Sequence, residues 1–220
     1  MRNLMEKIRS YFSGKAKYIV LNKRSFSENQ YYNFDYEVYA LHEISHAVSL
    51  RLYNNYQDIK DKSIIIKKNE DSHFYYRRNE DPNAKELYVD MMVCLSGFIS
   101  EMELLGVQGT SAYKDIIDWT EEAKRWLTLY SEDYIVIPET EAEVKWNNEV
   151  LIKHQSFQAS MIRELLRENK QTIFEFVEIV SKKRKATNEE ISLFLDNIIV
   201  PNGIYEKINQ IMDEASIKWN

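Results

Sequence analysis

The sequence has very little cysteine, glycine or proline. Among its 220 residues there are one cysteine, Cys94, five glycines and three prolines. A single cysteine cannot form an intramolecular disulfide or a structural zinc site made of cysteines, and it is typical of a reducing compartment. Because so few residues interrupt the helical periodicity of the chain, we predict a mainly α-helical fold.

Long apolar runs and a broad excess of basic charge are also missing. Charged residues interrupt residues 1–20, and no stretch approaches the roughly 20 apolar residues of a membrane span. The net charge is -6, with basic residues interspersed among acidic ones, which is not typical of a nucleic-acid-binding surface. The basic run "SKKRK" at 181–185 is interpreted as a solvated helix end. We therefore expect a cytoplasmic protein that neither binds nucleic acid nor inserts into a membrane.

The periodicity predicts a single compact domain over 34–220, preceded by an N-terminal extension at 1–33. Helices are expected at 34–55, from Pro82 to Gly106, at 114–131, and in a C-terminal helical bundle that begins near Glu139. "SIIIKK" (63–68) and "HFYYRR" (73–78) predict a small β-hairpin, and "YIVIP" predicts a short extended piece. Thr187 and Glu190 have the spacing of a capping box, which predicts a helix start.

One short motif carries recognisable chemistry. "ALHEISHAV", at 40–48, places His42 and His46 four residues apart, so both imidazoles project from the same face of a helix. Glu43 lies about 100° round the helix from His42, where it can contact a water on a metal ion that the histidines hold. This is the H-E-x-x-H pattern of metallopeptidases. Zinc would lower the pKa of the water, Glu43 would take its proton, and the resulting hydroxide would attack a peptide carbonyl.

An ordinary amphipathic helix is the competing interpretation. The predicted apolar stripe of this helix is displaced from the histidine face, which favours the metal site; it consists of Leu41, Ile44, Val48 and Leu52. A catalytic zinc also needs a third protein ligand and an open position. We interpret His73 and His154 as surface residues. Spacing alone leaves the choice open among four carboxylates: Glu101, Glu103, Asp115 and Asp118.

Several blocks of the sequence resemble the zinc peptidase domain of FtsH-type proteases, which are membrane-anchored and ATP-dependent. "LHEISHAVSL" is similar to the family's HEAGHA helix, and "LSGFISEMELLGVQGTSAYKDIIDWTEEAKRWL" (95–127) aligns without a gap with the stretch AGRAAEELIFGEVSTGASNDLERATELAR. "SIIIKK" falls where the family has a strand, and "MIRELLRENKQTIFEFVEIVSKKRKATNEEI" resembles its late helical stretch. The resemblance covers about residues 36–195. Matching positions in the second block include Gly97, Glu101, Gly106, Thr110, Asp115, Thr120 and Ala123.

The resemblance implies a role for each residue of the motif. His42 and His46 match the family's histidine ligands, Glu43 matches its catalytic glutamate, and Asp115 matches its third zinc ligand. One Zn²⁺ per chain is then expected. The sequence departs from the family pattern at Ile44 and Ser45, which replace small residues, at Phe98, which replaces an arginine, and at Lys114, which replaces an asparagine.

These observations lead to a functional prediction and one alternative. We predict a zinc-dependent endopeptidase that hydrolyses unfolded or flexible polypeptide. No G-x-x-x-x-G-K-[ST] phosphate loop occurs in the sequence, so this chain is not expected to unfold a substrate with ATP. It is expected instead to cut flexible or already unfolded polypeptide, to act on a dedicated partner protein, or to dock on a separate ATPase, and the resemblance also implies a homo-oligomer. An extended substrate is expected to add as a strand near "SIIIKK". The alternative is a non-catalytic regulatory or binding module; the presence of Glu43, which only catalysis needs, favours the enzyme.

Overall fold

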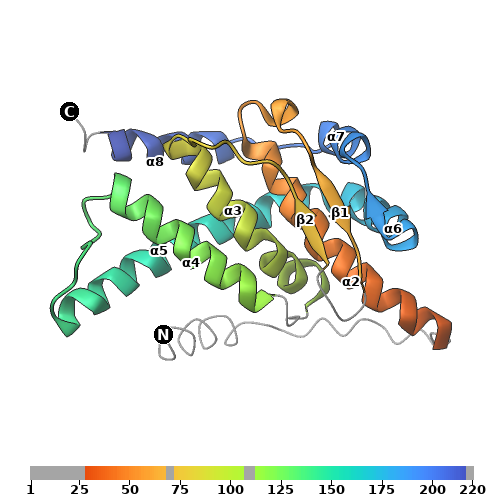
Figure 1. Ribbon diagram of the computed structural model, residues 1–220, viewed down its shortest axis with the longest axis horizontal. Coiled ribbons are helices and arrows are strands. Elements are labelled where there is room, and N and C mark those ends of the chain that lie inside the picture. Colours follow the sequence, from red (N-terminus) through yellow and green to blue (C-terminus); the bar gives the residue numbers. More distant parts are fainter. Residues whose placement is uncertain (1–27, 68–71, 107–111, 217–220) are drawn as a thin grey trace.

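The computed structural model describes residues 28–67, 72–106 and 112–216. It confirms a mainly helical fold with a small antiparallel sheet (Figure 1). Helix α2 begins before the predicted domain boundary at residue 34, and residues 1–27 of the predicted extension lie outside the described residues.

In chain order the elements are α2 (Glu28–Ser49), the 3₁₀ turns η1 (Leu50–Leu52) and η2 (Tyr56–Asp58), β1 (Ser63–Ile65), β2 (His73–Tyr75), α3 (Ala84–Ser100), the π-helix η3 (Glu101–Leu105), α4 (Ala112–Tyr130), α5 (Glu141–Glu168), α6 (Lys170–Lys183), β3 (Lys185–Ala186), α7 (Asn188–Asp196) and α8 (Ile204–Ser216).

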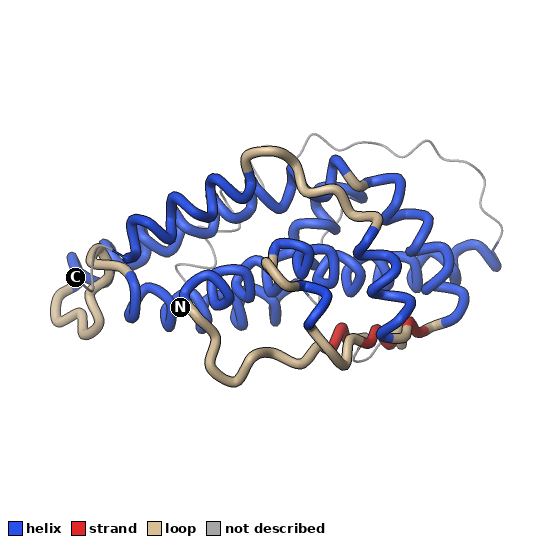
Figure 2. Tube along the Cα trace, turned by 90° about the horizontal axis from the view of Figure 1, so that it is seen from above, coloured by secondary structure: helices blue, strands red, loops and turns tan. Residues whose placement is uncertain are grey.

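Helix α3 lies at the centre of the molecule. Every residue from Leu87 to Ser100 is buried. The reason is that three helices, α2, α4 and α5, all pack against α3. Helix α6 covers a further side of α2. Figure 2 shows that the helices form an elongated body and that the short strands lie along one margin of it. This arrangement places α2 and α3, which carry most of the candidate site, in the interior.

Local sequence signals account for several helix ends. Helix α7 starts at the capping box that Thr187 and Glu190 predict, and α3 and α5 begin with similar boxes at Asn83 and Thr140. In each box the two residues satisfy backbone N–H groups that the first helical turn leaves unpaired. After Ser100 the backbone widens into the π-helix η3, which ends at Gly106 with a φ of 68°. A left-handed φ of this kind favours glycine.

The sheet has the strand order β2-β1-β3. Ile64 of β1 lies opposite Phe74 of β2 on one side and Ala186 of β3 on the other. The predicted hairpin is therefore confirmed in its two strands, while part of its turn, 68–71, lies outside the described residues. Because β1 is the central strand, both of its edges are paired within the sheet. The outer edges of this sheet belong to β2 and β3.

Two other local interpretations need correction. The run "SKKRK" is only partly a helix end: α6 stops at Lys183, Arg184 adopts a left-handed φ of 65°, and Lys185 enters β3. The stretch "YIVIP" forms no strand; it is an irregular connection between α4 and α5. Its backbone is held instead by Asn147, whose side chain donates to the carbonyl of Ile135 and accepts from its N–H.

Candidate metal centre

The part of α2 that carries the histidines is buried on all sides. Every residue from Ala40 to Leu50 is buried, and the exposed fractions of His42, Glu43 and His46 are only 3%, 5% and 8%. The predicted apolar stripe of this helix is buried, and the histidine face is buried as well. Helix α6 packs against α2, and the histidines point toward residues of α3 and α4. Polar groups buried in this way must find partners in the protein or bind a ligand.

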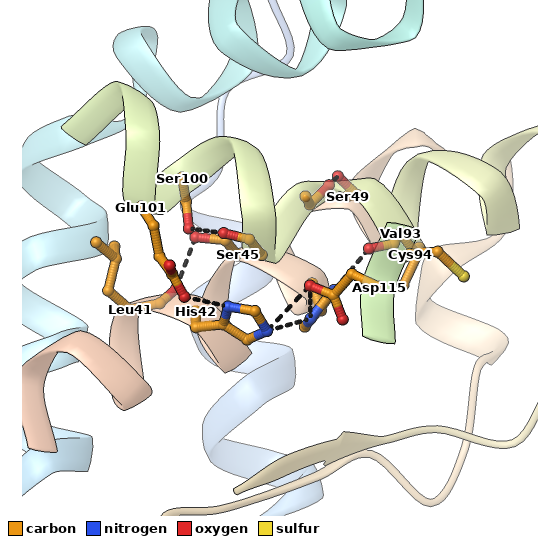
Figure 3. A network of polar contacts seen from close by, with 12 residues as sticks. Leu41, His42, Ser45, Ser49, Val93, Cys94, Ser100, Glu101 and Asp115 are labelled. Carbon is orange, nitrogen blue, oxygen red and sulfur yellow. Dashed lines mark hydrogen bonds and ion pairs between the residues drawn. The ribbon is translucent and has the colours of Figure 1, made fainter. Parts of the chain in front are cut away.

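Three ligand-type atoms converge beside this helix (Figure 3). The two Nε2 atoms of His42 and His46 are 3.1 Å apart. Asp115 Oδ2 lies 3.1 Å from Nε2 of His42 and 3.6 Å from Nε2 of His46. Asp115 comes from the first turn of α4. The sequence left four carboxylates as candidates for the third ligand. Among the described residues, Asp115 is the one of these four that lies with the two histidines in a metal-binding geometry.

The far sides of the two imidazole rings are held by the protein. Nδ1 of His46 donates to the carbonyl of Val93 at 2.6 Å, and Nδ1 of His42 lies 2.7 Å from a carboxylate oxygen of Glu101. Figure 3 shows Glu101 and Asp115 at opposite nitrogens of the His42 ring. Because a carbonyl and a carboxylate can only accept, each Nδ1 carries a proton. In each neutral ring the lone pair of Nε2 therefore points toward the Nε2 of the other histidine and toward Asp115.

This arrangement leaves an excess of acceptors at the centre of the cluster. Among the described residues, no hydrogen bond reaches the buried Oδ2 atom of Asp115. Two nitrogen lone pairs and a carboxylate oxygen repel one another unless a proton or a cation lies between them. Burial disfavours the charged form of His42, but contacts with Asp115 and Glu101 outweigh it and raise the pKa of His42 well above its usual value. Metal ions compete with protons for such ligands.

Gly97 provides the space for the cluster. A Cβ atom at this position of α3 would lie 2.6 Å from Nε2 of His42 and 2.6 Å from Nε2 of His46. Contacts that short are forbidden, so any larger residue would push the two rings away. Glycine destabilises a helix interior by about 0.5–1 kcal/mol relative to alanine. The close approach of the imidazoles gives a physical reason for its presence in α3.

The spacing of the three atoms fits one small cation. Zinc binds nitrogen and oxygen ligands at about 2.0–2.2 Å with tetrahedral geometry, which separates neighbouring ligand atoms by about 3.3 Å. The three observed separations, 3.1, 3.1 and 3.6 Å, lie close to this value. His42, His46 and Asp115 could therefore hold a divalent cation, and Glu43, next to His42 in the chain, is buried close enough for its charge to raise the pKa of His42.

The remaining candidate residues lie outside the cluster. Glu103 pairs with Arg167 at 2.6 Å, and His73 lies on β2, an outer strand of the sheet. The interpretation of His154 as a surface residue is wrong, because its ring packs 5.7 Å from that of Trp126. Burial lowers the pKa of His154 to about 4. Burial also raises the pKa of Cys94 to about 12, so this thiol is not a ready metal ligand.

Sequence reasoning missed how the protein supports the cluster. Glu101 was a candidate ligand, but in the structure it orients His42 from the opposite nitrogen. The role of Val93 rests on its backbone carbonyl, and no side-chain pattern reveals such a contact. Gly97 did give a signal, since an isolated glycine within a strong helical pattern indicates a packing or functional reason.

Comparisons with known proteins add no identification. No family model matches the chain, and no curated protein matches its sequence. The resemblance to FtsH-type peptidases therefore rests on the motif blocks alone. The chemical interpretation of the site depends on the geometry of its side chains.

Proposed function

We propose that this protein is a zinc-dependent endopeptidase of the FtsH peptidase type that cleaves unfolded or flexible polypeptide. The observation that carries the proposal is the convergence of His42, His46 and Asp115, with the buried Oδ2 of Asp115 lacking a hydrogen bond among the described residues. Two histidines and one carboxylate leave one position of a tetrahedral zinc site open, as catalytic zinc sites require. When bound there, zinc would supply Lewis acidity and lower the pKa of a water molecule toward about 7.

Each residue of the motif has a separate task in this proposal. His42 and His46 would hold the ion through Nε2, and Asp115 would hold it through a carboxylate oxygen. Glu43 does not bind the ion; it accepts the proton of the attacking water and passes it to the leaving amine. Glu101 and the Val93 carbonyl hold the two rings in the tautomer that binds metal, the supporting role that hydrogen-bond partners of metal-ligating histidines commonly have.

The sheet suggests where a polypeptide binds. An extended substrate can pair with an outer strand, and β2 is an outer strand that also contacts α2. We place the substrate along β2 rather than along β1. A separate ATPase, a dedicated partner protein, assembly into a homo-oligomer and a cytoplasmic location all stay part of the proposal. Among the described residues, no helix has the length and apolar character needed to cross a membrane.

The decisive experiment compares wild-type protein with Glu43→Gln. Glutamine keeps the shape of the side chain but cannot accept a proton, so the variant should bind zinc at wild-type stoichiometry and cleave unfolded protein at least about a hundredfold more slowly. Chelation should abolish wild-type cleavage, and added zinc should restore it. If zinc-loaded wild-type protein cleaves no unfolded polypeptide, alone or with a candidate ATPase, the enzyme proposal fails and a non-catalytic module is the better description.

A further inference from the structure

A polar cavity opens at the start of α3, a few turns before the metal centre. Its volume is about 350 Å³, which is within the size range of small-molecule and side-chain binding sites. Tyr53, Tyr76, Arg78 and Lys85 contribute to its wall. Four asparagines also line it: Asn54, Asn55, Asn79 and Asn83. Walls rich in amides, hydroxyls and charges favour a polar ligand over an apolar one.

Arg78 joins the wall of this cavity to helices α3 and α4. It follows β2 in the chain and lines the cavity, while its guanidinium donates to Glu122 of α4 at 2.6 Å and to Cys94 Sγ at 3.8 Å. Cys94 is the residue after Val93, whose carbonyl holds His46. The chain segment that follows β2 is therefore anchored to α3 and α4 where it borders the cavity.

The separation between the two sites suits an extended polypeptide. Val89 and Lys85 both line the cavity, and at 1.5 Å per residue they lie about 6 and 12 Å along α3 from Val93. Gly97, which touches both histidines, lies about 6 Å beyond Val93. An extended chain advances about 3.3 Å per residue. A polypeptide cleaved at the metal centre would thus reach the cavity with a residue about three to five positions from the scissile bond.

The charge of Lys85 points to the kind of side chain that fits. Its Nζ donates to Asn54 at 2.9 Å and to Asn209 at 3.1 Å, which are both neutral. No carboxylate of the described residues forms an ion pair with it, and burial lowers its pKa. Arg78, by contrast, pairs with Glu122. The Glu86 carboxylate accepts from the backbone N–H of Asn83 at 2.9 Å and from the amide of Asn79 at 3.3 Å, so its accepting oxygen is directed at the start of α3.

We propose that this cavity binds an aspartate or glutamate side chain of the polypeptide substrate and that Lys85 is the residue that determines this specificity. The inference rests on the peptidase function proposed above. Two acidic residues of the cavity wall, Asp58 and Glu86, oppose the preference, Asp58 only weakly because it is exposed and solvent screens it. The substrate carboxylate replaces or joins the asparagine oxygens around the ammonium group of Lys85.

The test uses matched fluorogenic peptides. Each peptide is neutral apart from one test position, which holds glutamate or glutamine and lies three, four or five residues on either side of a common cleavable bond. The measured quantity is the ratio of kcat/KM for the two peptides. Wild-type protein should favour glutamate by about three- to tenfold at one or more positions, the size expected for a partly buried ion pair. Lys85→Gln should bring the ratio close to one, and Asp58→Asn should raise it above the wild-type value.

Lys145→Gln is the matched control. Lys145 lies on an exposed part of α5 and pairs with Glu149 at 3.7 Å, so its replacement should leave the wild-type ratio unchanged. A ratio near one for wild-type protein at all tested positions overturns the proposal. So does a glutamate preference that survives in Lys85→Gln.

A binding measurement separates this inference from the proposed function. Dye-labelled forms of the same peptides are titrated by fluorescence anisotropy against Glu43→Gln protein with and without Lys85→Gln. A Lys85-dependent preference for glutamate in binding, with no cleavage by wild-type protein, supports the cavity and overturns the peptidase. Cleavage with no glutamate preference supports the peptidase and overturns the cavity. The absence of both cleavage and preference overturns both proposals.

Discussion

Gly97 of α3 lies directly against His46 of α2, so close that a Cβ atom on Gly97 would come within 2.6 Å of Nε2 of the histidine. The same Cβ would also come within 2.6 Å of Nε2 of His42. The backbone of α3 is therefore one wall of the candidate metal centre. A single methyl group on that wall would occupy the space that the two rings require.

The first prediction follows from this contact. Gly97→Ala should displace the two imidazoles and weaken zinc binding at least about tenfold, the lower end of the effects seen when the support of a metal site is changed. Competition with a chelating dye measures the affinity. Gly106→Ala is the control: its Cβ meets no atom within 4 Å, but its φ of 68° makes alanine unfavourable. It should lower stability by about 1 kcal/mol and leave zinc affinity unchanged.

A second prediction concerns the ligand set. Wild-type protein should bind about one zinc per chain, because three protein ligands and one open position form a single catalytic-type site. Asp115→Asn and His46→Ala should each lose most of this zinc, whereas Asp118→Asn should keep it, since Asp118 is on the same helix but outside the cluster. Elemental analysis after gel filtration decides the matter. Full zinc occupancy in Asp115→Asn would show that another residue is the third ligand.

Glu101 gives a third prediction, because it touches His42 but does not face the centre of the cluster. Glu101→Gln retains an oxygen that can accept from Nδ1 of His42, so zinc should still bind, with affinity reduced by about ten- to a hundredfold. Glu103→Gln, on the same π-helix, should have no effect on zinc. Isothermal titration of the metal-free proteins measures both. Complete loss of zinc in Glu101→Gln would instead make Glu101 a direct ligand.

The fourth prediction concerns how the stability of the protein depends on pH through His154, which lies outside the candidate metal centre. Burial lowers the pKa of His154 from 6.5 to about 4 in the folded protein. Below pH 6.5 the unfolded chain binds a proton that the folded chain rejects, so stability falls as the pH drops from about 6.5 to about 4, by up to about 3 kcal/mol. His154→Phe should remove this loss. Urea unfolding of both proteins across this range measures it, and parallel stability curves would contradict the prediction.

The parts of this structure that the sequence predicts depend on local chemistry. Thr187 and Glu190 are three residues apart, and their capping box forms as expected because both partners lie within one helical turn. The two strands of the hairpin are neighbours in the chain and pair as predicted. The pairing of Ile64 with Ala186 depends instead on how α6 packs against α2. No pattern near either residue contains that information.

The same distinction applies to the candidate site. His42, Glu43 and His46 could be identified because one helix fixes their relative directions. Spacing left Asp115 among several carboxylates; the family resemblance selected it, and the structure brings it to the histidines through the packing of α4 on α3. The burial of His154 escaped prediction for a similar reason, since the aromatic rings that cover it come from α3 and α4.

The pairing of β1 with β3 has a consequence for the order in which the protein matures. Strand β3 and the helix before it, α6, come from the last quarter of the described chain, yet they cover β1 and α2. During synthesis the N-terminal part emerges first, so α2 leaves the ribosome long before its partners exist. The helix that carries both histidines cannot be packed on all sides until residues 170–186 have been made. A metal centre built on this helix would therefore stay incompletely enclosed until α6 and β3 have been synthesised and have packed against α2 and β1.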